Sequence, residues 1–271
     1  MKKIAVLTDF SERAYHAAKY ALSLAAKLHA NIVLYHSFRV PSAQPLASQI
    51  AWPLEDYSEI KKDCQSALEK LKTQLEETQA GLARGFRPQI ECRAEEEQFD
   101  LIAEGALWDR DIVLVVIGNH HQGFSSLMLG NHSREVLNHS VMPVLVVPEN
   151  ASFEPFLRIA FATDLGRGDL DIVQSLSGLA GHFNAELLLT HLCESTPKNN
   201  LEVQDFLQEV TNKISYPHIY YRQLEEKHIR RGLHHMAETV KANLIVMVHR
   251  QKDFVEGLCL YHIKLDYRVA H

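Results

Sequence analysis

A stretch at the start of the chain recurs about halfway along it, and this repeat restricts the fold more than any other feature. Residues 3–9 read KIAVLTD and residues 158–164 read RIAFATD, an offset of 158 − 3 = 155. Solenoid proteins repeat every 20 to 50 residues or so, roughly a third of this offset or less. The sequence therefore predicts a tandem duplication of a whole domain. Three further pairs share the offset: Ala25 with Ala180, Ala30 with Ala185, and His36 with His191.

The length agrees with this organisation, because 271 residues can form two domains of about 135 residues each. The stretch Pro148–Pro155 begins and ends with proline and is interpreted as the linker. We expect the first domain over residues 1–149 and the second over residues 156–271.

Short apolar runs alternate with stretches of helical periodicity in both copies. This alternation predicts an α/β fold in which helices cover both faces of a parallel sheet. In the first copy we expect strands at 4–7, 31–35, 88–93, 112–117 and 143–147, and helices at 12–28, 58–82, 98–106 and 133–139. In the second copy we expect strands at 157–161, 186–190, 218–222 and 244–248, and helices at 170–182, 201–213 and 229–241.

Composition excludes several classes of protein. Lys plus Arg is 28 and Asp plus Glu is 34, and the resulting net charge of −6 gives no overall attraction to nucleic acid or to an anionic membrane. Four cysteines without a CxxC motif argue against a disulfide scaffold. No apolar run approaches the roughly 20 residues of a membrane-spanning helix. We expect a cytoplasmic protein that binds neither nucleic acid nor membranes.

A carboxylate and a glycine-rich segment follow two of the expected strands in the first copy. Asp9 comes after the first strand, and ligands of parallel α/β sheets bind beyond the carboxyl ends of the strands. The fourth strand runs into a segment that holds Gly118, Gly123 and Gly130 and ends at Ser133, where a helix is expected to begin. Glycines let a backbone approach a ligand closely, and the N–H groups at a helix start bind anions. The segment is a candidate phosphate-binding loop, although such glycines also serve turns alone.

The segments AVLTDFSE, IVLYHS and VVIGNHHQGFSSLMLGNHSREVLNHSVMPVLVVP are similar to the universal stress protein family. The resemblance covers nearly the whole chain as two tandem copies. It implies two Rossmann-like domains of the adenine nucleotide alpha hydrolase-like type, each built on a five-stranded parallel sheet. It also implies ATP or AMP as a regulatory ligand of the first domain. Carried over by position, the binding residues are Asp9 at the adenine, Ser37 beside it, and Gly118, Gly123, Gly130, Asn131 and Ser133 in the loop.

The loop departs from the family motif, which is Gly, two residues, Gly, nine residues, Gly, then Ser or Thr. His121 stands at the second glycine position, Gly123 comes two residues later, and Asn131 takes the Ser/Thr place. These departures keep a second interpretation open, that of a nucleotide-free interaction or dimerisation protein of the stress response. A slow ATPase is a third, for which the sequence shows no general base. The histidine pairs at 120–121 and 234–235 lack metal-ligand spacing, so no metal is predicted.

The second copy has lost the glycines of the candidate loop. When Phe124 is aligned with Phe254, the offset is 254 − 124 = 130, and Val248, Asp253 and Leu260 face the three glycines. We therefore expect nucleotide in the first domain only. Asp164 matches Asp9, and we interpret it as a turn or helix-capping residue.

The same alignment leaves nothing in the second copy that corresponds to residues 143–147. The second sheet is therefore predicted to lack its last strand, which would leave an unpaired edge. Either residues 144–147 of the first domain or another chain would cover this edge. Intramolecular domain pairing and a homodimer are the assemblies expected on this basis.

Overall fold

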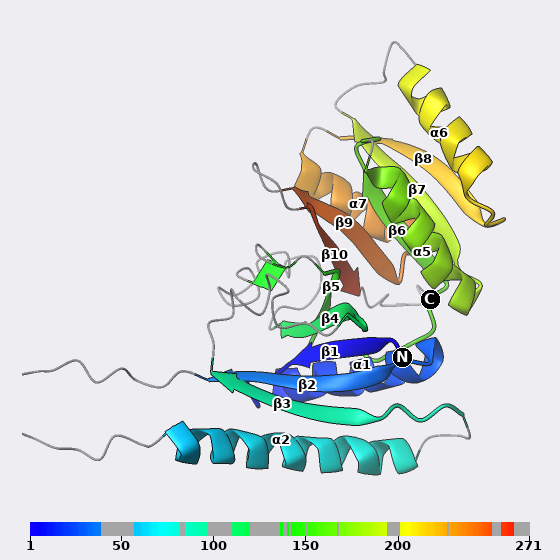
Figure 1. Ribbon diagram of the computed structural model, residues 1–271. Helices are drawn as coiled ribbons and strands as arrows, with labels where there is room; N and C mark the ends of the chain where they lie inside the picture. Colours follow the sequence, from blue (N-terminus) through cyan, green and yellow to red (C-terminus); the bar gives the residue numbers. More distant parts are fainter. Residues whose placement is uncertain are drawn as a thin grey trace, which may run out of the picture. The chain divides into compact units, whose positions relative to one another are not determined.

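In the computed structural model the chain forms two compact units, which consist mainly of residues 1–149 and of residues 150–271 (Figure 1). Within the described residues, each unit contains five strands. The structure describes residues 1–38, 57–81, 85–96, 110–119, 136–137, 140, 142–149, 151–166, 168–193, 201–226, 228–250 and 256–262.

The strands of the first unit run parallel in the order β3-β2-β1-β4-β5. The central strand β1 is apolar because both of its faces are covered, and Ile4, Ala5 and Val6 are fully buried. The chain therefore winds from β1 outward to one edge and then crosses to the other, as the predicted α/β fold requires. The bounds are β1 Lys3–Leu7, β2 Asn31–Phe38, β3 Ile90–Glu96, β4 Ile112–Asn119 and β5 Val144–Pro148.

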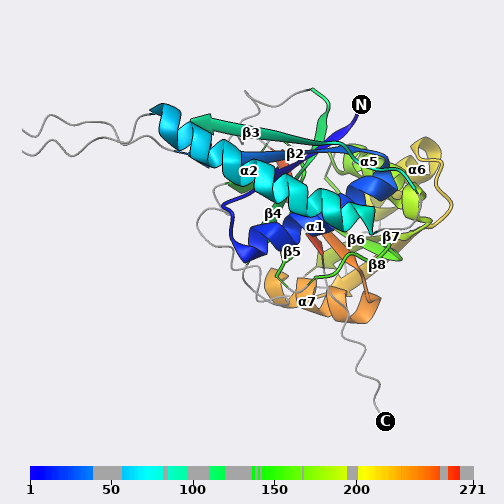
Figure 2. The ribbon, with the colours of Figure 1, turned by 90° about the horizontal axis from the view of Figure 1, so that it is seen from below.

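Two helices of the first unit, α1 (Glu12–Leu28) and α2 (Tyr57–Ala80), pack against the sheet and against each other (Figure 2). Ser11 caps the first of them, since its side chain accepts a hydrogen bond from the N–H of Ala14 at 3.3 Å. Helix α1 ends at Leu28 and is followed by its C-cap residue His29, whose φ of 52° is left-handed. The cap places the start of α1 directly beyond the carboxyl end of β1.

The second unit repeats this arrangement with four parallel strands in the order β9-β6-β7-β8. Strand register agrees with the offsets of the predicted repeat: Ile4 pairs with Leu114 in the first unit, and Ile159 pairs with Leu244 in the second. The two offsets are 159 − 4 = 155 and 244 − 114 = 130, the values predicted from sequence. The bounds are β6 Arg158–Thr163, α5 Asp169–Phe183, β7 Glu186–Cys193, α6 Leu201–Lys213, β8 Ile219–Glu225, α7 Ile229–Val240 and β9 Leu244–Arg250.

The predicted absence of a last parallel strand is confirmed, but the edge of β9 is not left open. Strand β10 (Glu256–His262) pairs with β9 in the antiparallel direction, with Leu260 opposite Val246. Only 256 − 250 − 1 = 5 residues join the two strands. That length suffices for a hairpin, whereas a parallel crossover needs about a dozen residues or more. The edge of β9 is therefore paired with a later segment of the second domain. This differs from both expected partners of the edge, which were residues 144–147 of the first domain and another chain.

Two strands extend farther than predicted, and this changes where two candidate residues lie. Strand β2 continues to Phe38, so Ser37 is paired with Glu95 inside the sheet instead of following the strand. Strand β4 continues to Asn119, so Gly118 is paired with Val147 and precedes the loop. In both places the neighbouring parallel strand extends the ladder beyond the apolar run on which the prediction rested.

The expected helix at 98–106 lies outside the described residues, and of the helix at 133–139 only residues 136–137 are described, as helical. Among the described helices, none combines the length and apolar character that a membrane span requires.

Candidate functional site

The candidate residues that the structure describes lie at one edge of the first sheet. Strand β1 has β2 on one side and β4 on the other, so the winding direction changes between β1 and β4. Ligands of parallel sheets bind at such a point, beyond the carboxyl ends of the strands. Asp9 follows β1, Ser37 lies near the end of β2, and Gly118 lies near the end of β4. Gly123, Gly130, Asn131 and Ser133 lie outside the described residues.

Asp9 is held in a tight turn by its own neighbours. One carboxylate oxygen, Oδ1, accepts hydrogen bonds from the backbone N–H of Ser11 at 3.0 Å and from the Ser11 hydroxyl. The other, Oδ2, accepts from the Arg13 guanidinium at 2.5 Å. Partial burial alone would raise the pKa of Asp9, but the bonds from Ser11 and Arg13 and the guanidinium charge lower it to about 2. The site therefore presents a fixed, ionised carboxylate whose side chain is 45% exposed.

Thr8 anchors this turn to the sheet. It is only 3% exposed, and its N–H donates to the carbonyl of Tyr35 at 2.9 Å. Its hydroxyl oxygen accepts from the N–H of Phe10 at 3.0 Å, and its carbonyl oxygen lies 2.8 Å from Nδ1 of His36. Phe10 itself has a φ of 61°, an uncommon conformation for a residue with a side chain. The hydrogen bonds to Thr8 stabilise that conformation.

Packing alone requires a glycine at position 118, whether or not a ligand binds there. A Cβ atom built on it would lie 2.6 Å from the carbonyl oxygen of Arg13 and 3.0 Å from its carbonyl carbon. The end of β4 therefore approaches the start of α1 more closely than any other residue type allows. This contact brings Gly118 and the Asp9–Arg13 turn to the same place.

The second unit contains the same turn at the offset of 155. Asp164 accepts from the N–H of Gly166 at 3.1 Å, as Asp9 does from Ser11. Thr163 accepts from the N–H of Leu165 at 2.9 Å, and Leu165 has a φ of 64°. The predicted turn role of Asp164 agrees with this geometry.

The surroundings of the second turn differ from those of the first. The N-terminal end of α5 has no side-chain cap, and its first residue, Asp169, is fully buried and accepts from the Thr163 hydroxyl. Asp169 occupies the position of Ala14, since 169 − 155 = 14. An acidic side chain thus stands beside the second turn where the first unit has a methyl group.

Three residues of the first turn, Thr8, Arg13 and His36, were not predicted as site residues. The signal for two of them was present in the sequence, because Thr8 matches Thr163 and His36 matches His191 at the repeat offset. Arg13 gave no such signal, since the matched position is Gly168. Its role follows from the ion pair that its guanidinium makes with Asp9.

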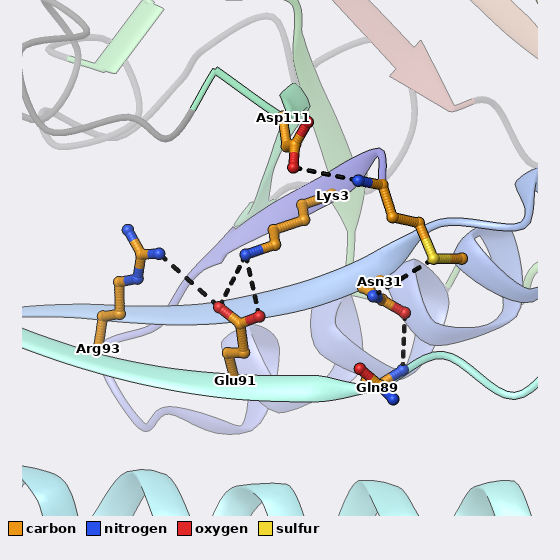
Figure 3. A network of polar contacts seen from close by, with 7 residues as sticks. Lys3, Asn31, Gln89, Glu91, Arg93 and Asp111 are labelled. Carbon is orange, nitrogen blue, oxygen red and sulfur yellow. Dashed lines mark hydrogen bonds and ion pairs between the residues drawn. The ribbon is translucent and has the colours of Figure 1, made fainter.

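The opposite ends of the same strands carry a separate polar network (Figure 3). Lys3 contacts Glu91 at 2.9 Å, and the N-terminal amine contacts Asp111 at 3.1 Å. The side chain of Asn31 accepts from the N–H of Gln89 at 3.0 Å. These contacts join the starts of β1, β2, β3 and β4, and we assign them a structural role. In the part of the chain that is described, no three His, Cys, Asp or Glu side chains group as metal ligands would.

Comparison with known proteins gives matches to one family. The sequence matches the universal stress protein family over residues 1–148. No curated protein matches the chain. A solved universal stress protein from Archaeoglobus fulgidus is 14% identical with a TM-score of 0.67, and the match covers 96% of this chain and 98% of that one. That match extends over both units and shows a shared fold.

Two further solved structures match about half of this chain. A universal stress family protein from Burkholderia pseudomallei is 23% identical with a TM-score of 0.40, and the match covers 54% of this chain and 96% of that chain. A universal stress family protein from Arabidopsis thaliana, solved with AMP bound, is 18% identical with a TM-score of 0.35 and coverages of 56% and 94%.

Proposed function

The chain belongs to the universal stress protein family, and from this premise we propose that its first domain binds ATP or AMP as a regulatory ligand. The observation that carries the proposal is the Asp9 carboxylate, which is ionised, fixed and partly exposed at the switch point between β1 and β4. Each carboxylate oxygen has two acceptor sites. Oδ1 accepts two bonds from Ser11, whereas Oδ2 accepts one from Arg13, so Oδ2 can accept a further bond from the amino group of adenine. Gly123, Gly130, Asn131 and Ser133 remain the proposed phosphate-binding positions, with Ser37 beside the base.

Calorimetric titration of the full chain with ATP and with AMP tests this proposal. We expect binding by the wild type and its loss in Asp9→Ala. Asp164→Ala is the matched control, because it removes the same turn carboxylate from the second domain. The control should bind as the wild type does. Equal affinities in both variants, or no binding and no co-purified nucleotide in the wild type, would contradict the proposal.

The second candidate function is that of a nucleotide-free interaction protein of the stress response. One observation favours it: Asp9 and Asp164 make the same turn, so the carboxylate has a structural role that needs no ligand. Mass spectrometry of the purified protein distinguishes the two functions. Absence of an adenine nucleotide, together with an unchanged melting temperature in millimolar ATP, is the result expected for the interaction protein.

Our proposal also includes a regulatory role in preference to catalysis, a cytoplasmic location, and a homodimer. The regulatory role rests on family membership. Mixing the purified chain with ATP and following phosphate release tests it, since sustained turnover that disappears in Asp9→Ala would identify an ATPase instead.

A further inference from the structure

The carbonyl group of Thr8 is held by a side chain from the neighbouring strand. Leu7 pairs with Tyr35 across β1 and β2, so the next residues along, Thr8 and His36, are adjacent. Nδ1 of His36 lies 2.8 Å from the Thr8 carbonyl oxygen. A carbonyl oxygen can only accept, so Nδ1 carries the proton and donates it. The imidazole thus fixes the orientation of the peptide that leads into the turn at Asp9.

An aromatic ring lies against this histidine. The rings of Phe10 and His36 have centroids 4.3 Å apart with a tilt of 39°. Phe10 reaches this position because its left-handed backbone turns the chain back toward β2. The Phe10 ring thus packs against the imidazole that contacts the Thr8 carbonyl.

The second domain repeats the same contact. Nδ1 of His191 lies 3.1 Å from the carbonyl oxygen of Thr163, and the partners are again 28 positions apart in the chain. The second copy keeps this histidine although it has lost the glycines of the loop. The contact therefore serves the turn after the first strand of each domain and is independent of the phosphate-binding segment.

From these contacts we propose that His36 is a positioning residue of the first domain: by holding the Thr8 carbonyl, it sets the turn that presents Asp9 to an adenine base. That the ligand is an adenine base rests on the proposed function. The position of Asp9 itself does not, because Ser11, Arg13 and His36 define it in the absence of any ligand. This separation allows the two ideas to be tested apart.

Two amide side chains distinguish a positioning role from simple packing. The amide nitrogen of asparagine is bonded to Cγ, as Nδ1 of histidine is, so His36→Asn keeps the donor. The amide nitrogen of glutamine is bonded to Cδ, one atom farther out, so His36→Gln places its donor beyond the Thr8 carbonyl. Both variants are polar and smaller than or similar to histidine in volume, which keeps their packing costs comparable.

The first measurement is ATP affinity by calorimetry in the full chain. We expect His36→Gln and His36→Ala to bind about tenfold more weakly, the loss of one oriented hydrogen bond. His36→Asn should stay close to wild type. His191→Gln, the matched control in the second domain, should leave ATP affinity unchanged.

The second measurement needs no nucleotide. Titration of the Asp9 carboxyl by nuclear magnetic resonance should give a pKa near 2 in the wild type and in His36→Asn. In His36→Gln the pKa should rise toward the ordinary value of 3.8, because a loosened turn weakens the bonds from Ser11 and Arg13.

The outcomes separate the two proposals. A wild type that binds no ATP overturns the proposed function, and the Asp9 titration then decides on His36 alone. An unchanged Asp9 pKa in His36→Gln, or a His36→Asn variant that behaves as His36→Gln does, overturns the positioning role. If His36→Ala does not fold, the comparison of Asn with Gln still decides.

Discussion

At the residue scale, Asp9 is kept ionised by its neighbours. Burial disfavours its charged form, whereas Ser11 and Arg13 favour it strongly enough to lower its pKa to about 2. Arg13 has no counterpart in the second copy, since the matched position is Gly168. The charge of the first turn is therefore set by a residue that the duplication does not share.

This depressed pKa makes the stability of the first domain depend on pH. The folded-state pKa lies below the ordinary value of 3.8, so the stabilisation by Asp9 is fully present above about pH 3.8 and is lost as the pH falls toward about 2. We expect Asp9→Asn to be less stable than wild type at neutral pH and to lose less stability across that window. Urea unfolding followed by tryptophan fluorescence measures this, because both tryptophans, Trp52 and Trp108, belong to the first copy.

Arg13→Gln is the companion variant. It removes the guanidinium and raises the pKa of Asp9 toward 3.8, so the acid-induced loss of stability should be smaller than in wild type and complete at a higher pH. A wild-type pH dependence in Asp9→Asn would show that other carboxyl groups carry the effect.

At the scale of elements, the site depends on how closely β4 approaches α1. Gly118 makes that approach, and its strand is paired on both sides, with β1 and with β5. Neither element can move aside without breaking ladder hydrogen bonds or the capped turn at Ser11. The second unit has Val248 at the position of Gly118. Its helix α5 begins at Asp169, two residues after Arg167, which matches the first residue of α1.

We expect Gly118→Ala to destabilise the first domain by about 1–3 kcal/mol, the usual cost of forcing extra volume into a packed contact. The added Cβ would meet the backbone of Arg13, which cannot rotate away as a side chain can. Urea unfolding followed by tryptophan fluorescence measures the change.

Gly178→Ala is the control for this prediction. Gly178 lies inside α5, and among the described residues no atom outside its own stretch of helix lies within 4 Å of its added Cβ. Alanine favours helices, so this variant should stabilise its helix by about 0.5–1 kcal/mol. Far-ultraviolet circular dichroism measures the change, because the second copy contains no tryptophan. A Gly118→Ala variant as stable as wild type would show that the β4–α1 contact relaxes easily.

At the scale of the whole molecule, the two domains share a turn but differ in what surrounds it. The second copy has Val248 in place of Gly118, and the buried carboxylate of Asp169 lies in the first turn of α5. This acidic side chain already occupies the space beside the helix start. A phosphate brought there would meet it in place of the methyl group of Ala14.

The asymmetry predicts one adenine nucleotide per chain. Calorimetric titration of the full chain should give a stoichiometry of about one, and Asp164→Ala should leave it unchanged. Native mass spectrometry of the complex provides an independent count. A stoichiometry of two, reduced to one by Asp164→Ala, would show that the second domain binds nucleotide despite its altered loop.

The sequence by itself determined the duplication, the α/β alternation and the placement of Asp9 and Asp164 at strand ends. It could do so because burial on both faces of a parallel strand produces a continuous apolar run, and the second copy repeats these runs in the same order. The four parallel strands of the second domain followed from such runs. Strand ends were less predictable, since Ser37 and Gly118 are not apolar and are held in strands by their neighbours.

Only the tertiary structure decided which residues His36, Thr8 and Gly118 contact. The partners of His36 and Gly118 are Thr8 and Arg13, 28 and 105 residues away in the chain, and no local pattern records such a contact. The antiparallel strand β10 was equally hidden, because its pairing depends on the free edge of β9 and on the five residues that reach it. Local patterns describe what each segment buries, whereas hydrogen bonds between distant segments depend on the assembled sheet.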